Sequence, residues 1–413
     1  MTCRVTLPPS KSIAARLIVI ALRGGYDPSY LFGDEEDLCD DLQVLLRAAR
    51  ILRDPSPAPK VIDLHDSGTA KRFLATLCGY TPGLTVCLRQ SARLAERPLD
   101  RLQETFMACG RSRRYGKRQN KEELWIEGHE YVGFGLPMSM DTSKSSQGCS
   151  AQMLVSPAGE SPTILSLSVN TVSSPYIEMT ASLMRACGVD VSYDKAGRKV
   201  TVNPGKYKRP DPSLMEADWS SASFMYLYAL LSGDKVLMPG LGSPGESLQG
   251  DSRIASLFEM LGVRTEVSDE GALVIPDGRP SGHRIDVSLR ECPDLVPPLA
   301  VACAMTGTPF LMRGISHLRF KESDHLKAVS EALGHFGLNV GIGADSLEWN
   351  GSESPIAPLE PVPSCNDHRI AMAFSLCTLR FPSVKVDNLS CIDKSFPAFV
   401  PILRDLKVPI NSL

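Results

Sequence analysis

Residues 318–329, LRFKESDHLKAV, combine both signs of charge and an imidazole where an apolar helical pattern begins. Lys321, Glu322, Asp324 and His325 stand within this stretch. A lysine can hold an anion, and a carboxylate or an imidazole can move a proton, so these residues suit acid–base chemistry on an anionic substrate. The ordinary alternative is a capped, solvated helix start, because Asp and Ser are common at that position.

Further basic residues lie in short polar stretches along the chain. Arginine binds a carboxylate or phosphate through two parallel hydrogen bonds, and lysine acts as a point charge. Each one alone could be ordinary surface, but together they predict a site for several anionic groups. They are Lys11, Arg16, Arg72, Arg97, Lys321, His368, Arg369 and Lys394.

Two carboxylates, Asp294 and Glu322, are mixed with these cations. A carboxylate opposes the binding of an anion, so we expect both to serve in general acid–base catalysis. The His and Cys residues lack the spacing of a metal site. No Walker-type phosphate loop and no Gly-rich dinucleotide fingerprint occurs. The sequence therefore predicts chemistry on two anionic substrates with no metal and no cofactor.

The elements that would position these residues follow a repeat. Six segments begin with a short polar stretch and continue as an apolar helical pattern, and the last four recur about every 74 residues. Helix N-termini carry free N–H groups and a partial positive charge, so convergent starts would bind anions. The six segments start at Ser10, Asp66, Ser145, Asp218, Pro293 and Asn366.

A second type of helix alternates with the first and ends at a glycine, which favours a left-handed C-cap. Short strand patterns at residues 199–204 and 272–277 follow two of these ends. Six units of helix and strand predict an α/β protein of two similar domains with three units each. The second helices are expected at residues 101–110, 176–191, 252–265 and 325–340.

Composition narrows the class of protein. The 413 residues are 43% hydrophobic, which is enough for two or three domains with a large core. Net charge is −3, so nothing indicates a nucleic-acid partner. The 12 cysteines form no C-x-x-C pair, which is typical of a reducing cytosol. No apolar run approaches the ~20 residues of a membrane-spanning helix, so we expect a cytoplasmic protein without a membrane partner.

The ordered motifs resemble the 5-enolpyruvylshikimate-3-phosphate (EPSP) synthase family. These motifs are SKSIAAR, SGTAKRF, ERPL, SSQ, SPYIEMT, KESD, NDHRIAMA and KSFP. The resemblance implies two inside-out α/β barrel-like domains, each of three β-α-β-α-β-β repeats. One would span residues 10–217 and the other residues 1–9 and 218–413, with a hinge near 9–12 and 216–220. It also implies a monomer, an expected target of the herbicide glyphosate, that combines phosphoenolpyruvate with shikimate 3-phosphate.

Matched motif by motif, the resemblance implies the residues that contact each substrate. For shikimate 3-phosphate these are Lys11, Ser12, Arg16, Ser145, Ser146, Gln147, Ser173, Tyr176, Asp294, His317 and Lys321. For phosphoenolpyruvate these are Lys11, Gly68, Arg97, Gln147, His325, Arg369 and Lys394. Asp294 would accept the proton of the attacking hydroxyl, and Glu322 would relay a proton to the enol methylene, with Lys394 as the alternative donor. Lys11 and His368 complete the implied catalytic set.

Three residues depart from the family pattern. The family usually has Arg at His325, Asn at Asp66 and Asn at His317. The first two changes make the expected phosphoenolpyruvate site less positive, and one lost charge-assisted contact typically costs ~1.5–3 kcal/mol. One hypothesis is that His325 binds as an imidazolium held by Glu322 or by the substrate. The stretch at residues 53–66 is also short, which predicts a trimmed sheet.

Other functions remain open at this point. One is a low-activity or repurposed relative of the same family. A second is UDP-N-acetylglucosamine enolpyruvyl transferase, which shares the fold but carries a reactive cysteine where this chain has Ala92. A third is a non-catalytic anion-binding protein, for which carboxylates among the cations would have little use.

Overall fold

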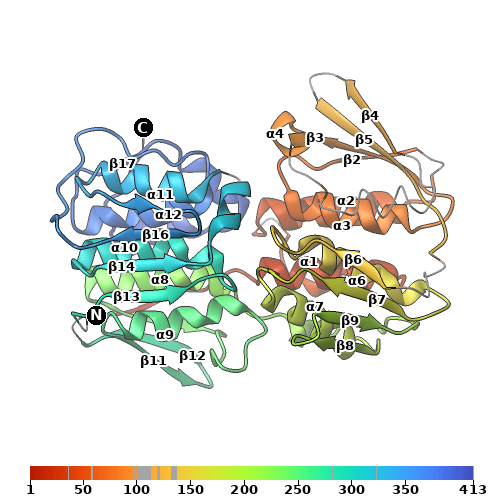
Figure 1. The fold of residues 1–413 in the computed structure, drawn as a ribbon, viewed down its shortest axis with the longest axis horizontal. Helices are drawn as coiled ribbons and strands as arrows, with labels where there is room; N and C mark the ends of the chain where they lie inside the picture. Colours follow the sequence, from red (N-terminus) through yellow and green to blue (C-terminus); the bar gives the residue numbers. More distant parts are fainter. Residues whose placement is uncertain are drawn as a thin grey trace. The chain divides into compact units, whose positions relative to one another are not determined.

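The computed structural model describes residues 1–413 except 36, 57–58, 97–98, 100–112, 119–120, 132–136, 279, 281, 322 and 413. The chain divides into two compact units (Figure 1). We call Lys11–Met215 the N-terminal unit, and Met1–Ser10 together with Glu216–Leu413 the C-terminal unit. None of the helices in the described ranges is both long and apolar enough to cross a membrane.

The N-terminal unit contains two described four-stranded sheets with the same plan. In each, the first two strands are parallel and the other neighbours are antiparallel, in the orders β2-β3-β5-β4 and β6-β7-β9-β8. The strands are β2 (Lys60–Asp63), β3 (Thr85–Gln90), β4 (Arg113–Arg118), β5 (Lys121–Glu127), β6 (Met138–Met140), β7 (Thr163–Leu167), β8 (Val191–Asp194) and β9 (Lys199–Val202). The helices are α1 (Lys11–Arg23), α2 (Asp40–Arg53), α3 (Gly68–Gly79), α4 (Ala92–Glu96), α6 (Gln147–Val155) and α7 (Pro175–Ala186).

The C-terminal unit repeats the plan in the orders β1-β10-β12-β11 and β13-β14-β16-β15, with a smaller parallel pair β17-β18. The strands are β1 (Thr2–Arg4), β10 (Lys235–Pro239), β11 (Val263–Ser268), β12 (Gly271–Pro276), β13 (Ile285–Ser288), β14 (Phe310–Arg313), β15 (Gly341–Ile342), β16 (Ser346–Trp349), β17 (Lys385–Val386) and β18 (Asn411–Ser412). The helices are α8 (Trp219–Ser232), α9 (Ile254–Glu259), α10 (Val296–Thr306), α11 (His325–Gly334), α12 (His368–Ser375) and α13 (Phe399–Asp405).

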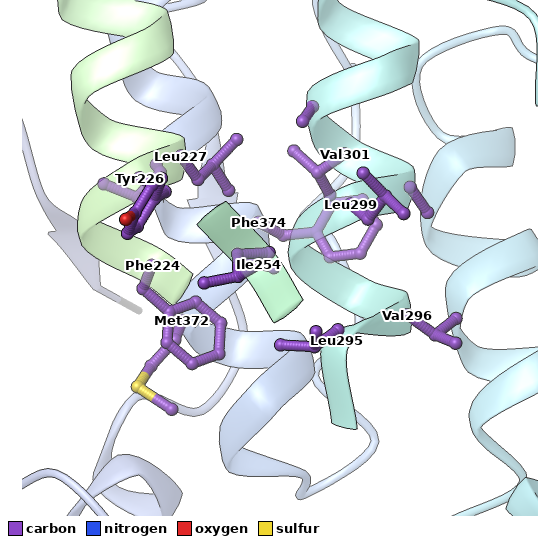
Figure 2. Packing of buried hydrophobic residues seen from close by; sticks show 14 of the residues in the cluster. Phe224, Tyr226, Leu227, Ile254, Leu295, Val296, Leu299, Val301, Met372 and Phe374 are labelled. Atoms are coloured by element: carbon purple, nitrogen blue, oxygen red, sulfur yellow. The ribbon is translucent and has the colours of Figure 1, made fainter. Parts of the chain in front are cut away.

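Helices α8 and α10 form the centre of the C-terminal unit. Residues 296–305 of α10 are all buried, as expected for a helix that is apolar on every side. Side chains from α8, α9, α10 and α12, including Phe224, Ile254, Leu299 and Phe374, meet in one core (Figure 2). Because α10 is packed against other elements on every side, the residues at its N-terminus are fixed in position.

The predicted helix starts are confirmed to within three residues. Helices α1, α3, α6, α8, α10 and α12 begin where the six polar stretches end. The predicted strands at 199–204 and 272–277 correspond to β9 and β12. Gly188 and Gly262 follow α7 and α9 with φ of 87° and 83°, a conformation that glycine adopts without strain. The helix predicted at 101–110 lies outside the described residues.

Candidate active site

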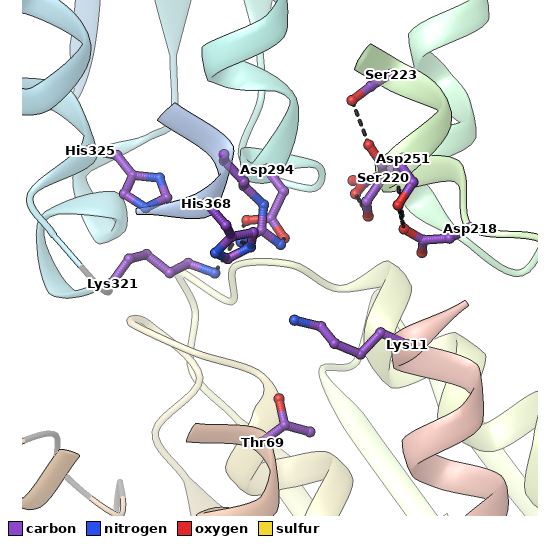
Figure 3. Close-up of polar contacts among 12 residues, drawn as sticks. Lys11, Thr69, Asp218, Ser220, Ser223, Asp251, Asp294, Lys321, His325 and His368 are labelled. Atoms are coloured by element: carbon purple, nitrogen blue, oxygen red, sulfur yellow. Dashed lines mark hydrogen bonds and ion pairs between the residues drawn. The ribbon is translucent and has the colours of Figure 1, made fainter. Parts of the chain in front are cut away.

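Asp294 lies directly before the central helix α10 of the C-terminal unit, in a single 3-10 turn. Its Oδ2 accepts a hydrogen bond of 2.7 Å from Nη2 of Arg369, and Nζ of Lys321 lies 3.6 Å from its Oδ1. Figure 3 shows Lys321 pointing toward Asp294, with His368 beside them. Two cations therefore contact the carboxylate of Asp294, whose side chain is only 8% exposed. A carboxylate fixed in this way can accept a proton beside a bound anion.

His368 and Arg369 are the first two residues of α12. Asp367 caps this helix by accepting a 3.0 Å hydrogen bond from the backbone N–H of Arg369. Nη1 of Arg369 lies 2.9 Å from Nε2 of His368. Helix α12 thus fixes both side chains close to Asp294.

Asp251 is a second carboxylate of this region, which the sequence did not indicate. It is 2% exposed, and its Oδ2 accepts a 2.5 Å hydrogen bond from Ser220 (Figure 3). Burial, followed by the negative charge of Asp294, raises the pKa of Asp251 to about 7. Two carboxylates in such different environments are typical of a site that both accepts and donates protons.

His317 lies in the 3-10 turn Ser316–Phe320 and is 3% exposed. Burial, followed by the charge of Lys321, lowers the pKa of His317 to about 4, so the ring is neutral at pH 7. Neither ring nitrogen has a hydrogen-bond partner among the described residues. A neutral buried imidazole can both donate and accept, and unsatisfied nitrogens favour a polar ligand here.

His325 has a different partner from the one predicted. The ring is fully buried, and its Nε2 lies 2.6 Å from Oδ2 of Asp367. The hypothesis assigned this interaction to Glu322 or to a substrate, whereas the structure places the ring against the cap of α12. Glu322 itself lies outside the described residues.

In the N-terminal unit, Lys11, Gly68 and Gln147 are the first residues of α1, α3 and α6. Nζ of Lys11 lies 3.1 Å from Oδ2 of Asp41. Oε1 of Gln147 accepts a 2.8 Å hydrogen bond from Nη1 of Arg72. Asp41 is a partner that the sequence did not indicate, and Arg72 was predicted only as one of many cations.

The side chain of Arg16 makes its contacts to other residues of the N-terminal unit. Its Nε donates to Oγ1 of Thr180 at 2.7 Å, and its Nη1 donates to the carbonyl of Ser12 at 2.8 Å. The guanidinium also lies over the ring of Tyr176, 5.6 Å from the centroid. Burial lowers the pKa of Arg16 to about 10, so it stays charged at pH 7. In this structure Arg16 orients Tyr176, which was itself predicted to contact substrate.

The remaining predicted residues fall into three groups. Ser145, Ser146 and Ser173 lie at or near the starts of α6 and α7, and Ser173 has a left-handed φ of 54°. Lys394 is half-buried at the end of the 3-10 turn Ser390–Lys394, in the C-terminal unit. Arg97 lies outside the described residues.

Asp66 was expected to weaken phosphoenolpyruvate binding through its negative charge. Its side chain is exposed and accepts a hydrogen bond from Ser91. Its charge is therefore in contact with water and with a hydroxyl donor. Among the described residues, no group of three His, Cys, Asp or Glu side chains could hold a metal ion.

Comparison with known proteins identifies the family of this chain. The model of the family EPSP synthase (3-phosphoshikimate 1-carboxyvinyltransferase) matches residues 33–403. The chain belongs to the EPSP synthase family. Similar relatives include the 3-phosphoshikimate 1-carboxyvinyltransferase of Bacteroides fragilis, 32% identical over 97% of this chain and 94% of the relative. That of Syntrophobacter fumaroxidans is 31% identical over 98% of this chain and 97% of the relative.

A solved structure shares the fold of this chain. EPSP synthase from Acinetobacter baumannii superimposes with a TM-score of 0.67, covering 98% of this chain and 95% of that one, at 19% identity. At such identity the likeness shows the fold, so the predicted class of two inside-out α/β domains is confirmed. These family and relative names do not favour the UDP-N-acetylglucosamine alternative.

Proposed function

We propose that this EPSP synthase family member transfers the carboxyvinyl group of phosphoenolpyruvate to the 5-hydroxyl of shikimate 3-phosphate and releases phosphate. The observation that carries the proposal is the carboxylate of Asp294, held between Arg369 and Lys321 in a chain that matches the family over nearly its whole length. A pure anion binder has no use for a carboxylate in contact with its cations.

In the addition step, Asp294 accepts the 5-hydroxyl proton while the oxygen bonds to C2 of phosphoenolpyruvate. Glu322 delivers a proton to the methylene carbon, with Lys394 as the alternative donor, and a tetrahedral intermediate results. Loss of a methyl proton then restores the double bond as the C2–phosphate bond breaks. A positioned general base is typically worth ~10²–10⁴-fold in rate.

Substrate binding is assigned to the helix starts of each unit. We propose that Ser145, Ser146, Gln147 and Ser173 hold shikimate 3-phosphate from the N-terminal unit. The neutral ring of His317 takes the family's Asn position and hydrogen-bonds a substrate hydroxyl, for which its unpartnered nitrogens are the support. Arg369 and Lys394 hold phosphoenolpyruvate as charge-assisted donors.

Phosphate release from the two substrates together tests the reaction directly. We expect sustained turnover with both substrates and none when either is omitted. Replacing shikimate 3-phosphate by UDP-N-acetylglucosamine should give no phosphate. Absence of turnover with both substrates, in protein that binds each of them by calorimetry, would favour a repurposed relative.

Two further expectations stay proposals, a monomeric state and a cytoplasmic location. The scattered cysteines, of which eleven are free in the described ranges, support a reducing compartment. Light scattering during size-exclusion chromatography should give a mass near 44.8 kDa. Fractionation of the source cells checks the location.

A further inference from the structure

His325 is the first residue of helix α11, but its side chain does not cap that helix, which Asp324 caps. A positive group is unfavourable at a helix N-terminus, which already carries a partial positive charge. The ring is fully buried, and neither ring nitrogen has a partner in the described part of the chain at normal hydrogen-bond geometry. Its close polar contact there is Asp367, at 2.6 Å from Nε2. The position of His325 is therefore explained by Asp367.

Asp367 connects two segments through its two oxygens. Oδ2 faces His325 and also accepts a 3.2 Å hydrogen bond from Oγ of Ser323, so this oxygen holds the segment that leads into α11. Oδ1 accepts from the backbone N–H of Arg369 and so holds the first turn of α12. The carboxylate is fully buried, which strengthens both contacts.

The same two segments meet a second time at Asp294. Lys321 precedes α11 by four residues and reaches Oδ1, while Arg369 of α12 reaches Oδ2. The segments are thus joined at two carboxylates, Asp367 in the interior and Asp294 at the proposed catalytic position. A shift at the first junction would displace both cations at the second.

We infer that His325 is a positioning residue that acts through Asp367 to hold Lys321 and Arg369 on the carboxylate of Asp294, and that it is not a phosphoenolpyruvate ligand. The inference rests on the proposed function, because its effect is measured as turnover. Removing the imidazole takes one close partner from the buried carboxylate of Asp367, and a buried charge that loses a partner favours local rearrangement. The arginine usual in this family at this position is longer than histidine, so in the same place it would displace the side chains that surround the ring of His325.

Three substitutions separate the two roles of His325. His325→Leu removes the polar ring at similar size, His325→Gln keeps a polar group near the position of Nε2, and His325→Arg introduces the family's usual residue. For a positioning residue, we expect His325→Leu and His325→Arg to lower kcat/KM for phosphoenolpyruvate about tenfold or more, with kcat falling and KM rising. His325→Gln should stay within about threefold of the wild type.

A double-mutant cycle with Asp367→Asn gives the second test. If the two residues act as one unit, His325→Leu combined with Asp367→Asn should be no worse than the more damaging single change. Effects that multiply would overturn the inference, as would a His325→Arg variant that equals or exceeds the wild type. An unchanged His325→Leu variant would do the same.

Controls keep these outcomes distinct. His335→Asn, at the half-buried residue that directly follows α11, should leave turnover unchanged. Thermal unfolding checks that each variant is folded, and if His325→Leu does not fold, Ser323→Ala should give a smaller loss in the same direction. A wild type without turnover counts against the proposed function, whereas normal turnover in both His325→Arg and Ser323→Ala counts against the positioning role alone.

Discussion

Arg369 and Asp294 lie 75 positions apart in the chain and meet through a 2.7 Å hydrogen bond between Nη2 and Oδ2. Each stands at the start of its own helix, α12 and α10, and these helices pack against each other in the core. The proposed base and a proposed phosphoenolpyruvate ligand are therefore placed by the same packing that stabilises the unit. Substitutions at this contact should affect catalysis more than folding.

Asp294→Asn should lower kcat by ~10²–10⁴-fold, because the amide cannot accept the hydroxyl proton. Initial rates of phosphate release at saturating substrates measure it. Asp286→Asn, at an exposed carboxylate on β13 that pairs with Arg313, is the matched control and should leave kcat unchanged. A kcat of Asp294→Asn near the wild-type value would assign the proton to another group.

Asp251 should make the folded protein less stable as pH rises. Its folded-state pKa is about 7, above the ordinary value of 3.8, so the folded protein binds this proton more tightly than the unfolded chain. Its contribution to the free energy of unfolding should fall between about pH 4 and pH 7, on the order of a few kcal/mol. Asp251→Asn cannot ionise, and its stability should vary less with pH.

Urea unfolding at pH 5, 6, 7 and 8 checks this expectation. The exposed Asp269→Asn variant is the control and should follow the wild type at every pH. Parallel curves for the wild type and Asp251→Asn would show that the pKa of Asp251 is not raised.

His317 should have the opposite pH dependence. Its folded-state pKa, about 4, lies below the ordinary value of 6.5, so the unfolded chain binds the proton more readily. The folded protein should lose stability as pH falls through this range, and His317→Asn should remove that part of the loss. Urea unfolding from pH 7 to pH 4 measures it, with the exposed His129→Asn as control. A larger loss in His317→Asn than in the wild type would contradict the assignment.

Arg72→Met should raise the KM for shikimate 3-phosphate about tenfold, because Gln147 loses the donor that orients its amide. The Arg72 side chain is buried, so the change also removes a charge from the start of α3. Steady-state kinetics with each substrate varied in turn measure the effect. Arg47→Met, on the exposed face of α2, is the control. A change confined to kcat would argue that Gln147 is oriented by other groups.

The sequence predicted the local features of this fold well. Capping residues next to an apolar period of three to four marked the starts of α1, α6 and α12, because the cap and the helix are neighbours in the chain. The left-handed glycines before β8 and β11 were predictable for the same reason. The ordered motifs then identified the family.

What the sequence could not predict depends on partners brought together by folding. Asp251 stands in a stretch with no motif and becomes unusual only through burial beside Asp294. Asp367 was part of a recognised motif, but its contact with His325 joins two helices that the sequence shows as separate. The burial of His325 and its contact with Asp367 were therefore not predicted, because exposure cannot be read from residue type alone.

Strand β1 pairs in parallel with β10, so the first residues of the chain belong to the sheet that also contains β12 and β11. The N-terminal unit is continuous and can complete its contacts as soon as residue 215 has been made. Strand β1 must instead wait through that whole interval before its neighbour exists. During synthesis Thr2–Arg4 therefore stay unpaired until β10 has been made, and the C-terminal unit is completed from residues on both sides of the N-terminal unit.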